Sequence, residues 1–129
     1  IGSGTFVWPV PNYTYVSRWM SSYHKGADIC AAYGTPIIAS DSGKVVTAGW
    51  HYSYGNYVII DHGNGYRTLY AHMSQLKCTA GQAVNQGDVI GLVGSTGDST
   101  GNHCHFEIRI NGAQTDPAAY FSGLSYWNC

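Results

Sequence analysis

Two Asn-Gly pairs constrain the fold of this chain more than any other local feature. Asn64-Gly65 follows a run rich in β-branched and aromatic residues, and Asn111-Gly112 closes a second such run. Type I′ turns need positive φ at both central positions, so Asn-Gly beside β-rich runs is a strong signal for a two-residue hairpin. We therefore predict antiparallel strand pairs at both dipeptides.

Most of the remaining sequence also alternates between short β-rich runs and turns. The other candidate strands lie at 35–39, 43–50, 57–61, 66–72 and 88–93. Only Pro117–Phe121 favours a helical turn, with proline in its first turn and Asp116 as the candidate N-cap. The sequence predicts an all-β fold of antiparallel sheets packed around one core, with one short C-terminal helical turn.

Length and composition set limits on the class of protein. The 129 residues predict one domain, 1–129, of which the segment 1–16, rich in Pro, Tyr and Gly, is the most loosely structured. Charged residues make up 10% of the chain and the formal net charge is -1. Since no run of Lys and Arg occurs, nucleic acid is not an expected partner.

The chain also lacks an apolar run of the roughly 20 residues that a membrane helix needs. It opens at Ile1 without a basic and apolar leader, which indicates a mature domain or a piece of a longer precursor. We expect a monomer that is secreted or associated with a cell wall and does not insert into a membrane.

The four cysteines are compatible with an oxidising compartment. Cys30, Cys78, Cys104 and Cys129 form no C-x-x-C pair, so a structural zinc knuckle is not expected. An even number of cysteines in a chain of low charge predicts one or two disulfides, with the connectivity open, and four buried thiols are the alternative.

The run His103–Ile110 carries the most information about function. In a strand, His103, His105, Glu107 and Arg109 would point to one face, while Cys104, Phe106, Ile108 and Ile110 would point to the other. The apolar set predicts a core face, and the opposite face begins with two imidazoles.

A second pair of candidate ligands lies near the start of the chain. His24 and Asp28 are four residues apart in a loop that enters a strand, and His72 ends another β-rich run. A catalytic zinc needs three protein ligands from His, Asp, Glu or Cys and leaves one position open. Neither pair is decisive by itself, but together they predict a catalytic metal site.

The ordered motifs of the chain resemble the lysostaphin-like (LytM-type) zinc peptidases, which hydrolyse the cross-linking peptides of bacterial peptidoglycan. The resemblance runs from about Ser17 to Phe121. Its motifs are His24-Lys25-Gly26-Ala27-Asp28-Ile29, Gly34-Thr35-Pro36, Gly43-Lys44-Val45-Val46, Tyr57–Gly63, Leu69–Ser74, Gly94-Ser95-Thr96-Gly97, Thr100–Glu107 and Asp116-Pro117.

Taken position by position, the resemblance implies that His24, Asp28 and His105 bind zinc. It implies that His72 and His103 are catalytic without binding the metal. Cys104 departs from the family, where leucine is more usual between the two histidines; alternation turns it into the core, where a free cysteine behaves as a small apolar residue.

A zinc peptidase needs a group that accepts a proton from water and a group that stabilises the developing oxyanion. His72 and His103 are the candidates for these two roles, with the assignment between them open. Glu107, the only glutamate of the chain, is a rival base, but we expect it to be out of reach, about 7 Å beyond His105 along the strand. His51 belongs to an aromatic loop, and His62 is expected to form local hydrogen bonds.

Three functions remain open at this point. The first is an active zinc endopeptidase of peptidoglycan. The second is an inactive member of the same fold that binds cell wall or activates another hydrolase, and the third is a disulfide-linked β module that recognises glycans. The presence of all five site residues favours the first function.

Overall fold

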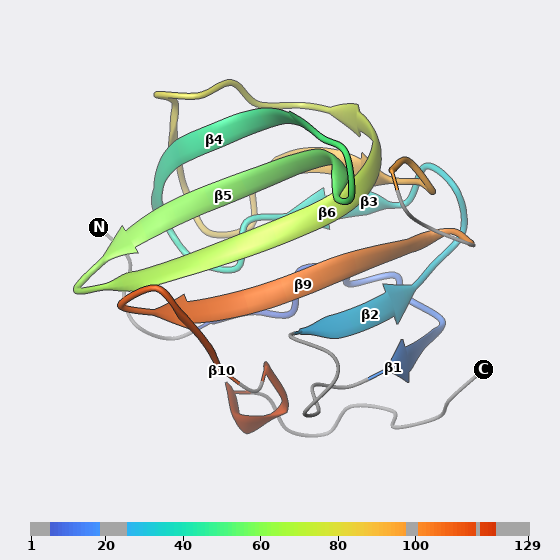
Figure 1. Cartoon of the computed structure of the whole chain (residues 1–129), viewed down its shortest axis with the longest axis horizontal. Coiled ribbons are helices and arrows are strands. Elements are labelled where there is room, and N and C mark those ends of the chain that lie inside the picture. The colour runs from blue at the N-terminus through green and yellow to red at the C-terminus, as the bar shows by residue number, and fades with distance from the viewer. Residues whose placement is uncertain (1–5, 19–25, 98–100, 116, 121–129) are drawn as a thin grey trace.

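The protein is an almost purely β structure, described here by a computed structural model of residues 6–18, 26–97, 101–115 and 117–120 (Figure 1). Its strands are β1 (Tyr15–Arg18), β2 (Ala27–Cys30), β3 (Pro36–Ile38), β4 (Gly43–His51), β5 (Gly55–Gly63), β6 (Tyr66–Leu76), β7 (Ala83–Val84), β8 (Val89–Val93), β9 (His103–Ile110) and β10 (Ala113–Thr115). All described pairings are antiparallel. The predicted all-β class is confirmed.

The strands follow the order β1-β2-β9-β6-β5-β4-β7, with β10 added to β9 and β3 joined through β8. Strand β6 is the centre of this arrangement, because it pairs with β5, β8 and β9. Its partner changes along its length: residues up to Ala71 pair with β9, and residues from Met73 pair with β8. His72 is therefore the residue at which β6 passes from one partner to the other.

Both predicted Asn-Gly hairpins are present. Asn64 and Gly65 have φ of 54° and 84° between β5 and β6, and Asn111 and Gly112 have φ of 51° and 86° between β9 and β10. Positive φ at both central positions is the signature of a type I′ turn, whose twist matches that of the strands it joins.

The core lies on the face of β9 that the alternating pattern predicted. Cys104, Phe106 and Ile108 are fully buried, while Ile110 is half-buried. They pack with side chains from the other strands, including Ile29, Val45, Val58, Ile60, Tyr70, Met73, Ile90 and Val93. Burial of each large aliphatic or aromatic side chain stabilises the fold by about 1.5–3 kcal/mol.

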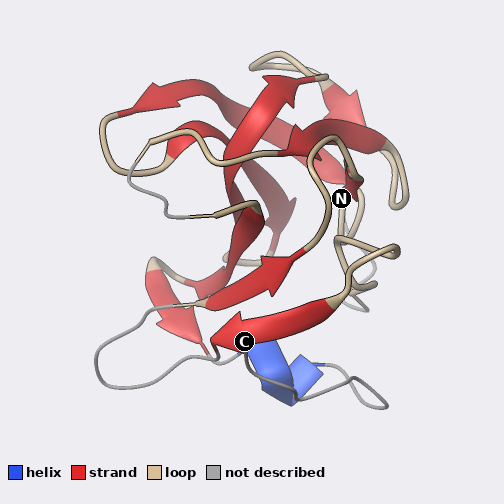
Figure 2. Cartoon of the chain, turned by 90° about the vertical axis from the view of Figure 1, so that its right-hand side faces the viewer, coloured by secondary structure: helices blue, strands red, loops and turns tan. Residues whose placement is uncertain are grey.

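The ends of the described chain add to this core without adding strands. Residues 6–14 form no strand, yet Phe6 and Val10 are buried. The predicted C-terminal helical turn is a 3₁₀ helix, η1 (Pro117–Tyr120), which lies beside the strands in Figure 2, and Tyr120 packs against the core. The expected N-cap, Asp116, lies outside the described residues. No helix in the described part of the chain is long and apolar enough to cross a membrane.

A hydrogen-bonded polar chain crosses the buried side of β5 and β6. The His62 ring lies 2.9 Å from the Ser42 carbonyl through Nδ1 and 2.7 Å from Thr68 Oγ1 through Nε2. Thr68 Oγ1 lies 2.6 Å from the Tyr70 hydroxyl, which accepts the backbone N–H of Ser40. Burial lowers the pKa of His62. His62 thus forms the local hydrogen bonds expected of it.

Among the described cysteines, Cys30, Cys78 and Cys104, no two are joined by a disulfide. Cys129 lies outside the described residues. The disulfide therefore stays a prediction.

Candidate functional site

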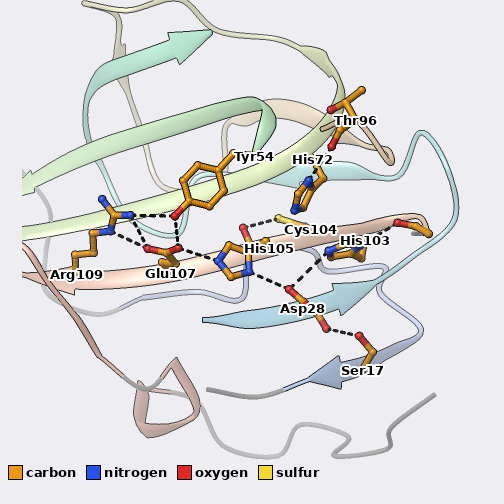
Figure 3. Close-up of polar contacts among 11 residues, drawn as sticks. Ser17, Asp28, Tyr54, His72, Thr96, His103, Cys104, His105, Glu107 and Arg109 are labelled. Atoms are coloured by element: carbon orange, nitrogen blue, oxygen red, sulfur yellow. Dashed lines mark hydrogen bonds and ion pairs between the residues drawn. The ribbon is translucent and has the colours of Figure 1, made fainter. Parts of the chain in front are cut away.

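Strand register brings four of the five predicted site residues together (Figure 3). Asp28 of β2 lies directly opposite His105 of β9, and His105 lies opposite Ala71 of β6. His103 is two residues before His105 on the same face of β9, and His72 follows Ala71. The fifth predicted residue, His24, lies outside the described part of the chain.

The His105 imidazole is held between two carboxylates. Its Nδ1 atom lies 2.9 Å from Oδ1 of Asp28, and its Nε2 atom lies 2.8 Å from Oε2 of Glu107. Burial of the ring opposes protonation, but the hydrogen bonds to both carboxylates and their charges outweigh burial and raise the pKa of His105 to about 9. In this state the ring donates a hydrogen bond from each nitrogen.

Glu107 is a buried carboxylate whose oxygens are both engaged. Only 1% of it is exposed. Oε2 accepts the Tyr54 hydroxyl at 2.9 Å as well as the His105 ring, and Oε1 accepts Arg109 Nε at 2.8 Å and Nη2 at 2.7 Å. Although burial raises its pKa, the hydrogen bonds and charges of His105 and Arg109 prevail, and the pKa of Glu107 is lowered.

Glu107 thus contacts the candidate site through the His105 ring nitrogen that faces away from Asp28, and the expectation that it is out of reach as a base stays a prediction. The side chains of Glu107 and His105, two residues apart on β9, turn toward each other. Tyr54 joins the same group, because its ring stacks on His105 with 5.8 Å between centroids. Burial and then the Glu107 charge raise the pKa of Tyr54 to about 12, so Tyr54 remains a hydrogen-bond donor to Glu107. Sequence reasoning missed Tyr54.

The His103 ring has one nitrogen fixed by the backbone. Its Nδ1 lies 2.9 Å from the carbonyl oxygen of Gly101, which can only accept, so Nδ1 carries the proton. Its Nε2 is 3.7 Å from Oδ1 of Asp28. The ring centroids of His103 and His72 are 4.7 Å apart.

His72 has an unusual backbone and a similarly fixed ring. Its φ is 62°, a conformation that residues other than glycine rarely adopt. The backbone N–H donates to the carbonyl of Tyr54 at 2.7 Å, and Nδ1 donates to the carbonyl of Thr96 at 2.7 Å. Burial lowers the pKa of His72. Figure 3 shows its ring directed toward His103 and His105.

Thr96 is held against the turn between β4 and β5. Its hydroxyl donates to the carbonyl of Met73 at 2.7 Å and accepts the backbone N–H of Asn56 at 3.1 Å. Gly55, with φ of 68°, approaches Thr96 so closely that a Cβ atom would collide with the threonine backbone. Sequence reasoning gave Thr96 no role, although the glycine-flanked motif that contains it belongs to the family resemblance.

Gly26 allows a similarly close approach of the chain to the His105 ring. A Cβ atom at Gly26 would lie 2.5 Å from the Phe106 carbonyl oxygen and 3.0 Å from Cε1 of His105. The glycine between His24 and Asp28 therefore lets the chain that enters β2 pass directly beside the His105 ring.

The chain matches peptidase family M23 over residues 22–117, a span that contains all of these groups. This chain belongs to family M23. The family resemblance indicated by the motifs is confirmed.

Two curated relatives are endopeptidases by name, and one of the two names specifies peptidoglycan. The "DD-carboxypeptidase/endopeptidase Mpg" of Neisseria meningitidis is 49% identical over 96 residues, 74% of this chain and 22% of the relative. "Peptidoglycan DD-endopeptidase ShyA" of Vibrio cholerae is 45% identical over 89 residues, 69% of this chain and 21% of the relative. This M23 chain thus spans about a fifth of the length of the curated relatives it matches.

Two solved peptidase structures share the fold. A zinc-containing peptidase from Vibrio cholerae has a TM-score of 0.82 and 30% identity, covering 93% of this chain and 40% of that one. The catalytic domain of lysostaphin from Staphylococcus simulans has a TM-score of 0.75 and 32% identity, covering 86% of this chain and 93% of that one.

The donors present in this M23 chain suit zinc. Oδ1 of Asp28 and Nδ1 of His105 converge to 2.9 Å, and carboxylate oxygen and imidazole nitrogen are both common zinc ligands. Within the described ranges no three His, Cys, Asp or Glu side chains form a metal cluster, and the third predicted ligand, His24, lies outside them. Cys104 is fully buried on the opposite face, and burial raises the pKa of its thiol to about 12, so it does not compete as a thiolate.

Proposed function

We propose that this chain is a zinc-dependent endopeptidase that hydrolyses peptide cross-links of bacterial peptidoglycan, with His24, Asp28 and His105 as the zinc ligands. The observation that carries the proposal is the orientation of His105. With Nε2 fixed by Glu107, the ring aims Nδ1 at Asp28, and a carboxylate behind a histidine ligand is a recurrent feature of zinc sites. The names of the wall-directed relatives support the choice of substrate.

Zinc, when bound, supplies a Lewis acid beside the scissile carbonyl. The donor set of one carboxylate and two imidazoles leaves it with net positive charge. A histidine binds a metal as the neutral ring, so the Nδ1 proton would leave when zinc binds. Glu107 would keep the remaining proton on Nε2 of His105, and the Nδ1 lone pair would be available to the metal.

His72 and His103 divide proton transfer and oxyanion stabilisation between them. In each ring a backbone carbonyl keeps the proton on Nδ1, so Nε2 is an acceptor while the ring is neutral and a donor once it is protonated. One ring can therefore accept a proton from the attacking water and pass it to the leaving amine. The other can donate a hydrogen bond to the developing oxyanion.

The location follows from the substrate. Cross-linked peptidoglycan lies outside the cytoplasmic membrane, so we propose that the chain acts as a monomer that is secreted or associated with the wall. The predicted single domain, 1–129, is the unit proposed to carry this activity.

The test separates metal binding from chemistry. Asp28→Ala and His105→Ala should lose zinc and hydrolysis together, whereas His72→Ala and His103→Ala should keep zinc and lose about 10²–10⁴-fold in turnover. Asp61→Ala, which removes a partly exposed carboxylate paired with Arg67, is the matched control and should change neither. Full zinc in Asp28→Ala or His105→Ala would exclude that residue as a ligand. Normal turnover in His72→Ala and His103→Ala would overturn the proposed mechanism.

A further inference from the structure

A polar pocket adjoins the candidate site at the β1 edge of the sheet. It has a volume of about 370 Å³, and its lining includes Ser17, Arg18, Asp28, Asn102 and His103. Figure 3 shows Ser17 and Asp28 side by side at this edge, where the Ser17 hydroxyl donates to the Asp28 carbonyl at 3.4 Å. The pocket is therefore lined in part by a candidate zinc ligand, Asp28, and a candidate catalytic residue, His103.

Arg18 is placed in this pocket by strand register. It lies opposite Asp28 across the β1–β2 pair, and Asp28 lies opposite His105 across the β2–β9 pair. The β1–β2 register shifts between Val16 and Arg18, and beyond this bulge Arg18 lines the same pocket as Asp28 and His103.

Arg18 differs from the other described arginines in its ion pairing. Arg109 is paired with Glu107 at 2.7 Å, and Arg67 is paired with Asp61 at 3.4 Å. Arg18 forms no ion pair with the described part of the chain, and its side chain is exposed. The carboxylate of Asp28 is directed at His105 and His103, at 2.9 Å and 3.7 Å, rather than at Arg18.

A guanidinium is suited to a carboxylate, because its planar fork can donate two parallel hydrogen bonds to the two oxygens. Peptidoglycan cross-links made through a D-amino acid and those made through a glycine bridge differ in whether a free carboxylate lies beside the scissile amide. When an α-amino group forms the scissile amide, the carboxylate on the same carbon can remain free, two bonds from the amide nitrogen. An internal glycine bridge has no free carboxylate at that position.

We infer that Arg18 binds a free carboxylate of the substrate next to the scissile amide nitrogen, and that the chain consequently prefers D-amino-acid cross-links over glycine bridges. The inference rests on the proposed peptidase function and adds the substrate class. In this inference Arg18 determines which substrate binds, and His72 and His103 carry out the chemical step.

The test compares two probes that differ only in that group: a peptide ending in D-alanyl-D-alanine with a free carboxylate, and the same peptide as its carboxamide. A hydrogen bond to a charged group is typically equivalent to about 10- to 100-fold in affinity. Wild type should show a kcat/KM higher by about that factor for the carboxylate probe. Arg18→Ala should lose the preference by slowing only that probe, and Arg18→Lys should retain part of it. Arg67→Ala removes an exposed arginine elsewhere and should keep the preference.

Binding gives a second readout that does not need turnover. The dissociation constants of both probes are measured on the zinc-loaded His72→Ala variant and on His72→Ala/Arg18→Ala. Tighter binding of the carboxylate probe only when Arg18 is present supports the inference, even if the wild-type chain proves inactive and the proposed function fails. Equal affinity for both probes in His72→Ala, or an equal loss for both on removing Arg18, would overturn it.

Discussion

The Nε2 atom of His105 lies 2.8 Å from Oε2 of Glu107, and this contact orients the ring that faces Asp28. The carboxylate is itself held by Tyr54 and Arg109, so the position of the ring is determined by a chain of hydrogen bonds behind it. Glu107 could orient the His105 ligand or accept a proton from water. Substitution of an orienting group weakens zinc binding, whereas substitution of the base lowers turnover at full zinc occupancy.

Glu107→Gln should weaken zinc binding by about 10- to 100-fold, the range typical for the loss of a group behind a metal ligand. Gln keeps the shape of the side chain but removes the charge that holds the Nε2 proton. The zinc dissociation constant is measured by competition with a chelator, and Asp61→Asn serves as a control that changes an ion-paired carboxylate elsewhere. If turnover of the zinc-saturated variant is abolished and its zinc affinity is unchanged, Glu107 is the base instead.

Gly55→Ala should damage both stability and turnover. The substitution places a Cβ atom against the backbone of Thr96, whose carbonyl holds the His72 ring. Gly34→Ala is the matched control, because Gly34 has φ of 86° and open space around it.

Gly34→Ala should lower the free energy of unfolding by about 1–2 kcal/mol through backbone strain alone. Gly55→Ala should lower it by about 1–3 kcal/mol more, because of overpacking. Chemical denaturation and peptide hydrolysis measure the two effects. Equal stability losses and normal turnover in both variants would mean that the Gly55–Thr96 contact does not support the site.

Stability should fall as the pH drops below about 6.5, in part because of His62. Burial lowers the pKa of this ring in the folded protein, so the unfolded chain binds the proton first. The contribution of His62 to the free energy of unfolding is complete above the pKa of this ring in the unfolded chain. It is lost as the pH falls through the lower pKa of the ring in the folded protein. His62→Gln should flatten this part of the curve of unfolding free energy against pH. A curve parallel to that of the wild type would show that His62 is not responsible.

Cys104→Ser should keep its zinc and lose stability. The thiol is fully buried on the core face of β9, and a hydroxyl there costs about 1–3 kcal/mol when its hydrogen bonds are incomplete. Metal analysis and denaturation test the two parts of this expectation. Loss of zinc from a folded Cys104→Ser variant would contradict the placement of Cys104 away from the metal.

The local part of this architecture could be predicted from the sequence. Strand period and turn chemistry act over a few residues, so the Asn64-Gly65 and Asn111-Gly112 turns and the buried face of Cys104, Phe106 and Ile108 followed from them. The juxtaposition of Asp28 and His105 came from the family resemblance, because pairing between β2 and β9 joins residues far apart in the chain.

The groups behind the site could not be predicted in the same way. Whether Glu107 reaches His105 depends on side-chain rotamers, which strand spacing does not specify. Tyr54 and Thr96 lie in separate loops, and the carbonyl of each accepts a hydrogen bond from His72, the residue at which β6 changes partner.

That partner change has a consequence for the entropy of the reaction. A ring on a mobile loop would have to be ordered each time substrate binds, at a cost of about 0.5–1.5 kcal/mol per side chain. His72 is ordered when the sheet forms, since its amide and its ring are tied to Tyr54 and Thr96 between two ladders of a central strand. Most of the conformational entropy of His72 is therefore lost when the protein folds. The free energy of substrate binding is then available to position the substrate rather than to order this side chain.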